Sequence, residues 1–182
     1  MMKIAITGSK GFIGSHLIKK ISNIKNIRLV EFDKSKNNLF DVESLKNFVK
    51  DAETIVHLAG ANRASEEEMI KTNVLGTLNL LEAIRKYNNN SKIIFASSFQ
   101  VYNPNNKVDE NSKIDPQTIY GMSKKFSEDL IKFYSKNFGI KYIILRLSNV
   151  YGPGSRPNYN SVIATFCYNA ARKQKLNVNK LA

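Results

Sequence analysis

The chain has 182 residues, 42% of them hydrophobic, which suits one domain with a substantial core and excludes two ordinary domains. Its 28 Lys and Arg against 15 Asp and Glu give a formal net charge of +13, but the basic residues are scattered, so we expect a solvated basic surface and no nucleic-acid partner. The single cysteine, Cys167, excludes an internal disulfide, the two histidines are too few for a metal site, and no apolar stretch is long enough to span a membrane.

Short apolar runs alternate with longer amphipathic segments, the order expected of a parallel sheet covered by helices. The apolar runs predict strands at 3–7, 27–32, 54–59, 92–97 and 141–147. Apolar residues three and four apart predict helices at 11–21, 42–50, 66–87 and 120–138, the last with Gly139 as its C-cap. The fold class is therefore α/β, a doubly wound parallel sheet of the Rossmann type. The polar segment 103–118 is the longest irregular stretch, and long loops in compact domains are often functional.

Residues 7–14 read TGSKGFIG, with glycines at three-residue spacing between the first predicted strand and the first predicted helix. Glycine is ordinary in turns, but a dinucleotide site needs this arrangement, because glycines let the backbone approach the pyrophosphate and the helix N-terminus offers free N–H groups. Asp33 ends the second predicted strand, where a carboxylate binds the adenosine ribose hydroxyls. This pattern favours NAD. Lys10, Lys34 and Lys36 leave NADP open, since a cation near the ribose attracts a 2′-phosphate.

Tyr120 and Lys124 stand four residues apart on the last predicted helix, which puts the phenol and the ammonium on one face. We expect the cation to lower the Tyr120 pKa toward neutrality, so that the phenol exchanges a proton with a substrate hydroxyl. Ser98 follows the fourth predicted strand, at the carboxyl ends of the strands where open α/β sheets place active sites, and its hydroxyl can hydrogen-bond the same oxygen. Alone, each feature is common, as a chance spacing or a strand-end cap. Together they predict a catalytic site.

These motifs resemble the extended short-chain dehydrogenase/reductase family, which includes the NAD-dependent nucleotide-sugar epimerases and dehydratases. The matching segments, in family order over residues 3–154, are TGSKGFIG, Asp33, Asp41-Val42, HLAG, TNVLGTLNLLEA, FASSFQVY, YGMSK and RLSNVYGPG. The resemblance implies a catalytic triad of Ser98, Tyr120 and Lys124. Aligned on Val101-Tyr102, the catalytic serine falls on Ser98 and not on Ser97, whereas Asn103 stands where the family has glycine.

By the same resemblance, Asp41 and Val42 lie against the adenine, Asn73 supports the cofactor-binding region, and Lys124 also holds the nicotinamide ribose. The implied cofactor-binding residues are Gly8, Lys10, Gly11, Phe12, Ile13, Gly14, Asp33, Asp41, Val42, Leu58, Ala59, Gly60, Asn73, Tyr120 and Lys124. The implied substrate-binding residues are Ser98, Asn149, which would reach the phosphates of a nucleotide-sugar, and Arg156.

The resemblance implies a dinucleotide-binding domain at 1–154 and, at 155–182, the start of a truncated substrate-binding region, so that the sugar-binding domain is largely absent. The lack of a long apolar stretch predicts a cytoplasmic protein, and the resemblance implies a homodimer formed through helices 66–87 and 119–138. The expected activity is epimerisation or reduction at C4 of a UDP-sugar. Segments 57–63 and 156–172 resemble capsular-polysaccharide reductases, and Phe99 and Gln100 after Ser98 argue against dehydration, which needs a further acid and base there. A non-catalytic dinucleotide-binding module is the alternative.

Overall fold

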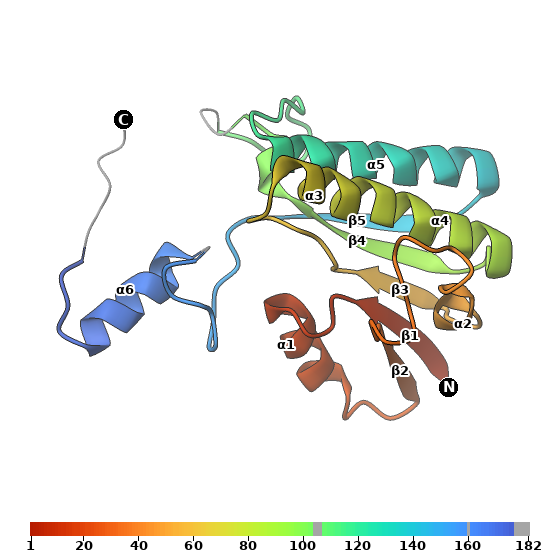
Figure 1. Ribbon diagram of the computed structural model, residues 1–182, viewed down its shortest axis with the longest axis horizontal. Helices are drawn as coiled ribbons and strands as arrows, with labels where there is room; N and C mark the ends of the chain where they lie inside the picture. The colour runs from red at the N-terminus through yellow and green to blue at the C-terminus, as the bar shows by residue number, and fades with distance from the viewer. Residues whose placement is uncertain (104–106, 160, 177–182) are drawn as a thin grey trace. The chain divides into compact units, whose positions relative to one another are not determined.

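The computed structural model describes residues 1–103, 107–159 and 161–176, and the chain divides into two compact units, Met1–Leu147 and Ser148–Ala182. The first unit is built on a five-stranded parallel sheet with strand order β2-β1-β3-β4-β5 (Figure 1). The strands are β1 (Met2–Thr7), β2 (Ile27–Glu31), β3 (Thr54–His57), β4 (Lys92–Ser98) and β5 (Lys141–Leu147). The predicted parallel α/β sheet and its five strands are confirmed.

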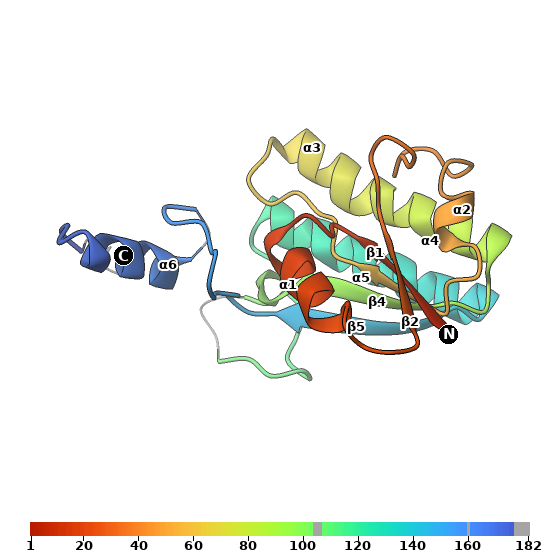
Figure 2. The same cartoon turned by 90° about the horizontal axis from the view of Figure 1, so that it is seen from below.

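The direction of the chain across the sheet decides which face each helix covers. From β1 the chain moves to β2 through α1 (Phe12–Ile21), then returns past β1 to β3 and continues outward to β4 and β5. Because crossovers between parallel strands are right-handed, this reversal puts α1 on one face of the sheet and the later helices on the other (Figures 1 and 2). The later elements are α2 (Lys46–Val49), α3 (Glu66–Ile70), the π-helix η1 (Lys71–Leu75), α4 (Gly76–Tyr87) and α5 (Ile119–Phe138).

The main core lies between the sheet and the helices α2, α4 and α5, which cover one of its faces. Every second residue of β4 points into it, and Ile93 and Phe95 are at most 1% exposed. Residues of the covering helices, or directly before them, that are at most 2% exposed meet these side chains, among them Leu45, Phe48, Leu80, Leu81, Ile84 and Ile131. This packing fixes α5 against β4, and with it the relative positions of Ser98, Tyr120 and Lys124.

Two predicted helices differ from the structure. The helix expected at 42–50 covers only Lys46–Val49, because side chains bind the preceding backbone in turns: the Asp41 carboxylate accepts from the Glu43 N–H at 3.0 Å, and the Ser44 hydroxyl donates to the Asp41 carbonyl at 2.8 Å. The helix expected at 66–87 is continuous but contains the π-helical segment η1. The helix predicted at 120–138 and its C-cap Gly139, with φ of 74°, are confirmed.

The second unit contains α6 (Val162–Ala171), inside the amphipathic segment 156–172, and the Ser161 hydroxyl caps it by accepting from the Ala164 N–H at 3.2 Å. In the long loop 103–118, residues 104–106 lie outside the described residues, and Tyr102 and Ile114 form an antiparallel bridge. Across the described part of the chain, no helix is both long and apolar enough to cross a membrane, and no group of three His, Cys, Asp or Glu is placed to hold a metal.

Candidate active site

The loop between β1 and α1 depends on glycine at its two ends. Gly8 has a φ of +68°, and a Cβ atom there would lie 2.7 Å from the Ala59 backbone nitrogen at the end of β3. A Cβ atom on Gly14 would overlap the Gly8 carbonyl oxygen. The Gly11 N–H closes the loop by donating to that same oxygen at 2.9 Å. The tight turn therefore requires glycine at positions 8 and 14, and Phe12 and Ile13 begin α1.

This loop also leaves polar groups available to a ligand. Gly11 is the N-cap of α1, so within the described structure no side chain caps the N–H groups of the first turn. The Ser9 residue is 3% exposed, and its hydroxyl has no hydrogen-bond partner among the described residues. A buried hydroxyl without a partner beside the positive end of a helix dipole fits the diphosphate of a dinucleotide.

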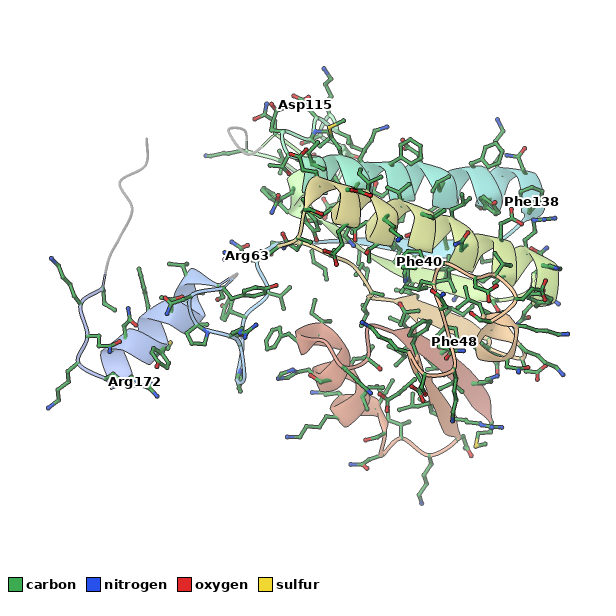
Figure 3. The ribbon with its side chains drawn as sticks, viewed as in Figure 1. Phe40, Phe48, Arg63, Asp115, Phe138 and Arg172 are labelled. Atoms are coloured by element: carbon green, nitrogen blue, oxygen red, sulfur yellow. The ribbon has the colours of Figure 1, made fainter. Side chains whose placement is uncertain are left out.

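Asp33 lies at the end of β2 beside a cavity of about 520 Å³. The Ser35 N–H and hydroxyl donate to its carboxylate at 3.0 and 2.8 Å, and these two hydrogen bonds hold the Asp33 pKa below its usual value. Lys10 and Lys36 line the same cavity, together with the rings of Phe32 and Phe48, which meet edge-on with 5.5 Å between centroids. Phe48 is labelled in Figure 3. The cavity is thus lined by a charged carboxylate, two cations and an apolar wall.

Asp41 and Val42 do not line this cavity. The Asp41 carboxylate is bound to the backbone of the turn before α2, and Val42 packs against the main core. The cavity wall on that side comes instead from Ser44 and Asn47. Contact of Asp41 and Val42 with an adenine remains a prediction.

The end of β3 brings Leu58, Ala59 and Gly60 beside the glycine loop, because Thr7 pairs with His57 in the sheet. The Thr7 Oγ1 accepts from the Ala59 N–H at 3.1 Å and lies 2.7 Å from the His57 Nδ1. On the other side, the His57 Nε2 lies 3.1 Å from the Thr77 Oγ1. His57 is fully buried, and burial lowers its pKa to about 3, so this imidazole is neutral and structural.

Asn73, on the π-helix η1, connects the loop after β3 to α5. Its side-chain oxygen accepts from the Ala61 N–H at 2.7 Å, and its amide donates to the Ala61 carbonyl and to the Ser123 hydroxyl, each at 2.9 Å. A Cβ atom on Gly60 would lie 3.1 Å from this Asn73 oxygen and 3.2 Å from the Lys124 Nζ. Asn73 therefore connects the loop after β3 to α5, the helix of the proposed triad. Its place on a π-helical turn fits this position, because such turns are frequent at functional sites.

Ser98 and Tyr120 meet at the carboxyl end of β4. The Ser98 side chain lies close enough to the Tyr120 phenol to influence its pKa, while the Ser98 Oγ accepts from the Gln100 N–H at 3.2 Å. The expected lowering of the Tyr120 pKa by Lys124 is not what the structure gives: burial raises the Tyr120 pKa, and the Ser98 side chain only partly offsets this effect. The reason is the direction of Lys124, whose ammonium lies 5.9 Å from the centre of the Tyr120 ring and hydrogen-bonds elsewhere.

Lys124 is 4% exposed and lies beneath the same strand end. Its ammonium donates to the Ala96 carbonyl at 2.9 Å and stands 4.8 Å from the centre of the Phe95 ring. Burial lowers the Lys124 pKa to about 8, against an opposing effect of the Glu128 carboxylate. The structure thus brings Ser98, Tyr120 and Lys124 together, as the sequence predicts, with the lysine deeper in the protein than the phenol.

The sequence does not reveal the roles of three residues around this site, Ser97, Glu128 and Arg146. Ser97 does not point toward Tyr120: its hydroxyl donates to the Glu128 carboxylate at 2.5 Å, and Arg146 on β5 binds the same carboxylate. Two features of the sequence could have drawn attention to them: Glu128 lies on the same helix face as Lys124, and Arg146 stands in a mostly apolar strand. Neither signal identifies its partner before the fold is known.

Asn149 and Arg156 belong to the second unit, Ser148–Ala182. There the Arg156 guanidinium lies 5.5 Å from the centre of the Tyr159 ring, and the Gly152 N–H donates to the Ser155 hydroxyl at 3.0 Å. Substrate binding by Asn149 and Arg156 remains a prediction.

The NAD dependent epimerase/dehydratase family model matches residues 4–181. Since the match extends over nearly the whole chain, the chain belongs to this family. The structure is similar to a crystal structure of UDP-glucuronic acid 4-epimerase from Bacillus cereus in complex with NAD, with a TM-score of 0.82 and 27% sequence identity over 96% of this chain and 64% of that one.

Two curated relatives point to nucleotide-sugar chemistry. A Methanocaldococcus jannaschii protein, assigned provisionally as a UDP-glucose 4-epimerase, is 40% identical over an alignment 179 positions long that covers 85% of this chain and 58% of the relative. The Pseudomonas aeruginosa UDP-2-acetamido-2,6-beta-L-arabino-hexul-4-ose reductase is 32% identical over 98% of this chain and 44% of its own length. The chain thus spans about half the length of the curated relatives it matches.

We expect Gly14→Ala to weaken NAD binding by about tenfold, because the added methyl group overlaps the Gly8 carbonyl oxygen and must displace the loop. Calorimetric titration with NAD measures the affinity. Gly76→Ala is the matched control, since a Cβ atom there would meet only the Leu39 side chain at 3.7 Å. A folded Gly14→Ala protein with wild-type NAD affinity would contradict this account of the loop.

Lys124 should make the free energy of unfolding depend on pH. Its folded-state pKa of about 8 lies below the unfolded value, so between the two the unfolded chain holds a proton that the folded chain has lost, and stability rises with pH. Relative to Lys124→Met, the wild type should gain about 1.4 kcal/mol per pH unit between about pH 8 and the usual lysine pKa of 10.5, and nothing below about pH 7. Urea unfolding of both proteins across this range measures the difference, and parallel curves would disprove the assignment.

Proposed function

We propose that this chain carries the NAD-binding and proton-transfer machinery of a cytoplasmic UDP-sugar 4-epimerase or C4 reductase that serves surface-polysaccharide synthesis. The observation that carries the proposal is the pairing of Ser98 with Tyr120 above the buried Lys124, next to a glycine loop with an unpartnered buried hydroxyl. The printed activities of the two curated relatives, a 4-epimerase and a hexul-4-ose reductase, support chemistry at C4.

The proton at the sugar oxygen is handled by Tyr120 in this proposal. Because burial raises its pKa, the phenol is protonated at neutral pH and is ready to donate to the oxygen of a C4 carbonyl during reduction. Ser98 hydrogen-bonds the same oxygen and orients it, and Lys124 places positive charge beneath the phenol when the proton leaves. Bound nicotinamide supplies or accepts the hydride at C4. Epimerisation reverses these roles and then repeats them on the other face of the sugar.

We assign NAD as the cofactor, and NADP is the alternative. The diphosphate would lie at the glycine loop, and the adenosine ribose would lie at the Asp33 carboxylate, whose negative charge favours ribose hydroxyls over a 2′-phosphate. Lys10 and Lys36 on the same cavity oppose this preference. Asn149 and Arg156 are proposed to bind the nucleotide-sugar. Dehydration is disfavoured because Phe99 and Gln100 follow Ser98 where an acid and a base would be needed.

Turnover assays of the chain test the function. The chain with NAD and a UDP-hexose should form the C4 epimer, or with NADH should reduce a UDP-4-ketohexose. Tyr120→Phe should lower kcat by about 10²- to 10⁴-fold and change NAD affinity far less, because the aromatic ring is kept. Tyr142→Phe, on the exposed part of β5, is the matched control and should behave as wild type. Saturable NAD binding without turnover on any UDP-sugar would instead favour the non-catalytic module.

We also propose that the protein forms a homodimer through the outer faces of α3 to α5. Met122, Phe126 and Phe133 on α5 share one face of the helix and are 53%, 55% and 56% exposed, and Ile70 on α3 is 45% exposed. Burying such a face against a second copy removes apolar surface from water.

The variant Phe126→Lys/Phe133→Lys should shift the protein from dimer to monomer, because charges would lie in the buried face. Sedimentation equilibrium measures the mass, and Ile143→Lys, which alters an apolar residue of β5 that is 42% exposed, serves as the control. A variant that remains dimeric would show that this face is not the interface, and a monomeric wild type would rule the dimer out.

A further inference from the structure

Glu128 is a fully buried carboxylate at the centre of a network that the proposed chemistry does not use. It lies two turns after Tyr120 on α5. Its Oε1 accepts from the Ser97 hydroxyl at 2.5 Å, and its Oε2 accepts from the Arg146 Nη2 at 2.8 Å. The Arg146 Nε donates to the same carboxylate at 3.0 Å, so the pair is bidentate and joins α5 to β4 and β5.

The network also reaches the segment that follows Ser98 in the chain. The Arg146 Nη1 donates to the Tyr102 hydroxyl at 2.5 Å, and the guanidinium lies 5.1 Å from the centre of the Tyr102 ring. Tyr102 is 4% exposed and follows the 3-10 helix η2 (Phe99–Val101), which begins directly after Ser98. The residue before Ser98 and the residue directly after η2 are thus tied, the first directly and the second through Arg146, to one carboxylate on the helix that carries Tyr120.

We propose that Glu128 is a positioning residue: by holding Ser97 and, through Arg146, Tyr102 against α5, it fixes the Ser98 hydroxyl where it meets the Tyr120 phenol. The proposal rests on the function proposed above for Ser98 and Tyr120. A purely stabilising role is a weaker explanation, because a buried ion pair gives little more stability than apolar residues of the same size. The pair instead gives direction, since a bidentate carboxylate–guanidinium contact fixes both angle and register.

The charge of Glu128 also acts within the site. Lys124 lies one turn before it on α5 and Lys132 one turn after it, with the Lys132 Nζ 3.8 Å from the carboxylate. Arg146 faces it from β5, Tyr102 faces Arg146 from the end of η2, and the neutral His57 on β3 faces Lys124. In this setting the Glu128 carboxylate raises the Lys124 pKa against the larger effect of burial.

Glu128→Gln tests the proposal, with Asp129→Asn as the matched control, since Asp129 is the next residue and pairs with Lys125 at the surface. Nuclear magnetic resonance of lysine-labelled protein follows the titration of Lys124. Its resonance is identified as the one that is missing from the spectrum of Lys124→Met. The Gln100 amide reports on Ser98, whose Oγ accepts its proton. We expect Glu128→Gln to lower the Lys124 titration midpoint, to speed exchange of the Gln100 amide and to reduce kcat about tenfold at unchanged NAD affinity, and Asp129→Asn to change none of these.

Glu128→Gln leaves Arg146 without its partner, so the second variant is Glu128→Gln/Arg146→Met, which removes both charges and keeps the volume. We expect this double variant to fold but to keep the altered Gln100 exchange and the reduced kcat. Recovery of both together with wild-type stability would overturn the proposal, and so would wild-type Gln100 exchange in a folded Glu128→Gln protein. The lysine titration and amide exchange need neither cofactor nor turnover, so they separate failure of this inference from failure of the proposed function.

Discussion

The burial of the Lys124 ammonium is the constraint on which the rest of the site depends. A cation removed from water is costly unless the protein supplies partners, and here a backbone carbonyl, an aromatic face and a carboxylate one helical turn away supply them. All three partners come from the end of β4 or from α5. Correct placement of the lysine therefore requires the helix to lie against the strand end, and this also brings Tyr120 to Ser98.

The sheet topology provides that contact. The chain reverses its direction between β1 and β3, so the helices that follow these two strands cover opposite faces of the sheet, and open α/β sheets bind ligands at the carboxyl ends of the strands beside such a switch point. The glycine loop approaches from one side of this point and α5 from the other, and Asn73 and the residues after β3 connect them. In the proposed function, two sets of residues far apart in the sequence would therefore serve one site, the first for a diphosphate and the second for a proton.

Much of this arrangement could be predicted because its signals are local. The period of apolar residues predicts the strands and helices, the glycine spacing marks the loop, and the four-residue spacing places Tyr120 and Lys124 on one face. Burial and long-range pairing are not local. The direction of the Tyr120 pKa shift depends on how deeply the phenol is buried, and the Glu128 contacts with Ser97 and Arg146 join residues that only the folded sheet brings together. Helix α2 is shorter than its apolar period predicts, because side-chain hydrogen bonds of Asp41 and Ser44 hold the preceding backbone in turns.

The central claim is that the glycine loop, Asp33 and Lys124 form one dinucleotide site in this chain. Calorimetric titration of the wild-type protein with NAD, and separately with NADP, tests it most directly. The account predicts saturable binding of one NAD per chain, tighter than that of NADP, because the Asp33 carboxylate favours a ribose without a 2′-phosphate. If neither dinucleotide bound saturably to the folded chain, the loop would be only a tight turn between strand and helix, and the proposed chemistry would lose its hydride carrier.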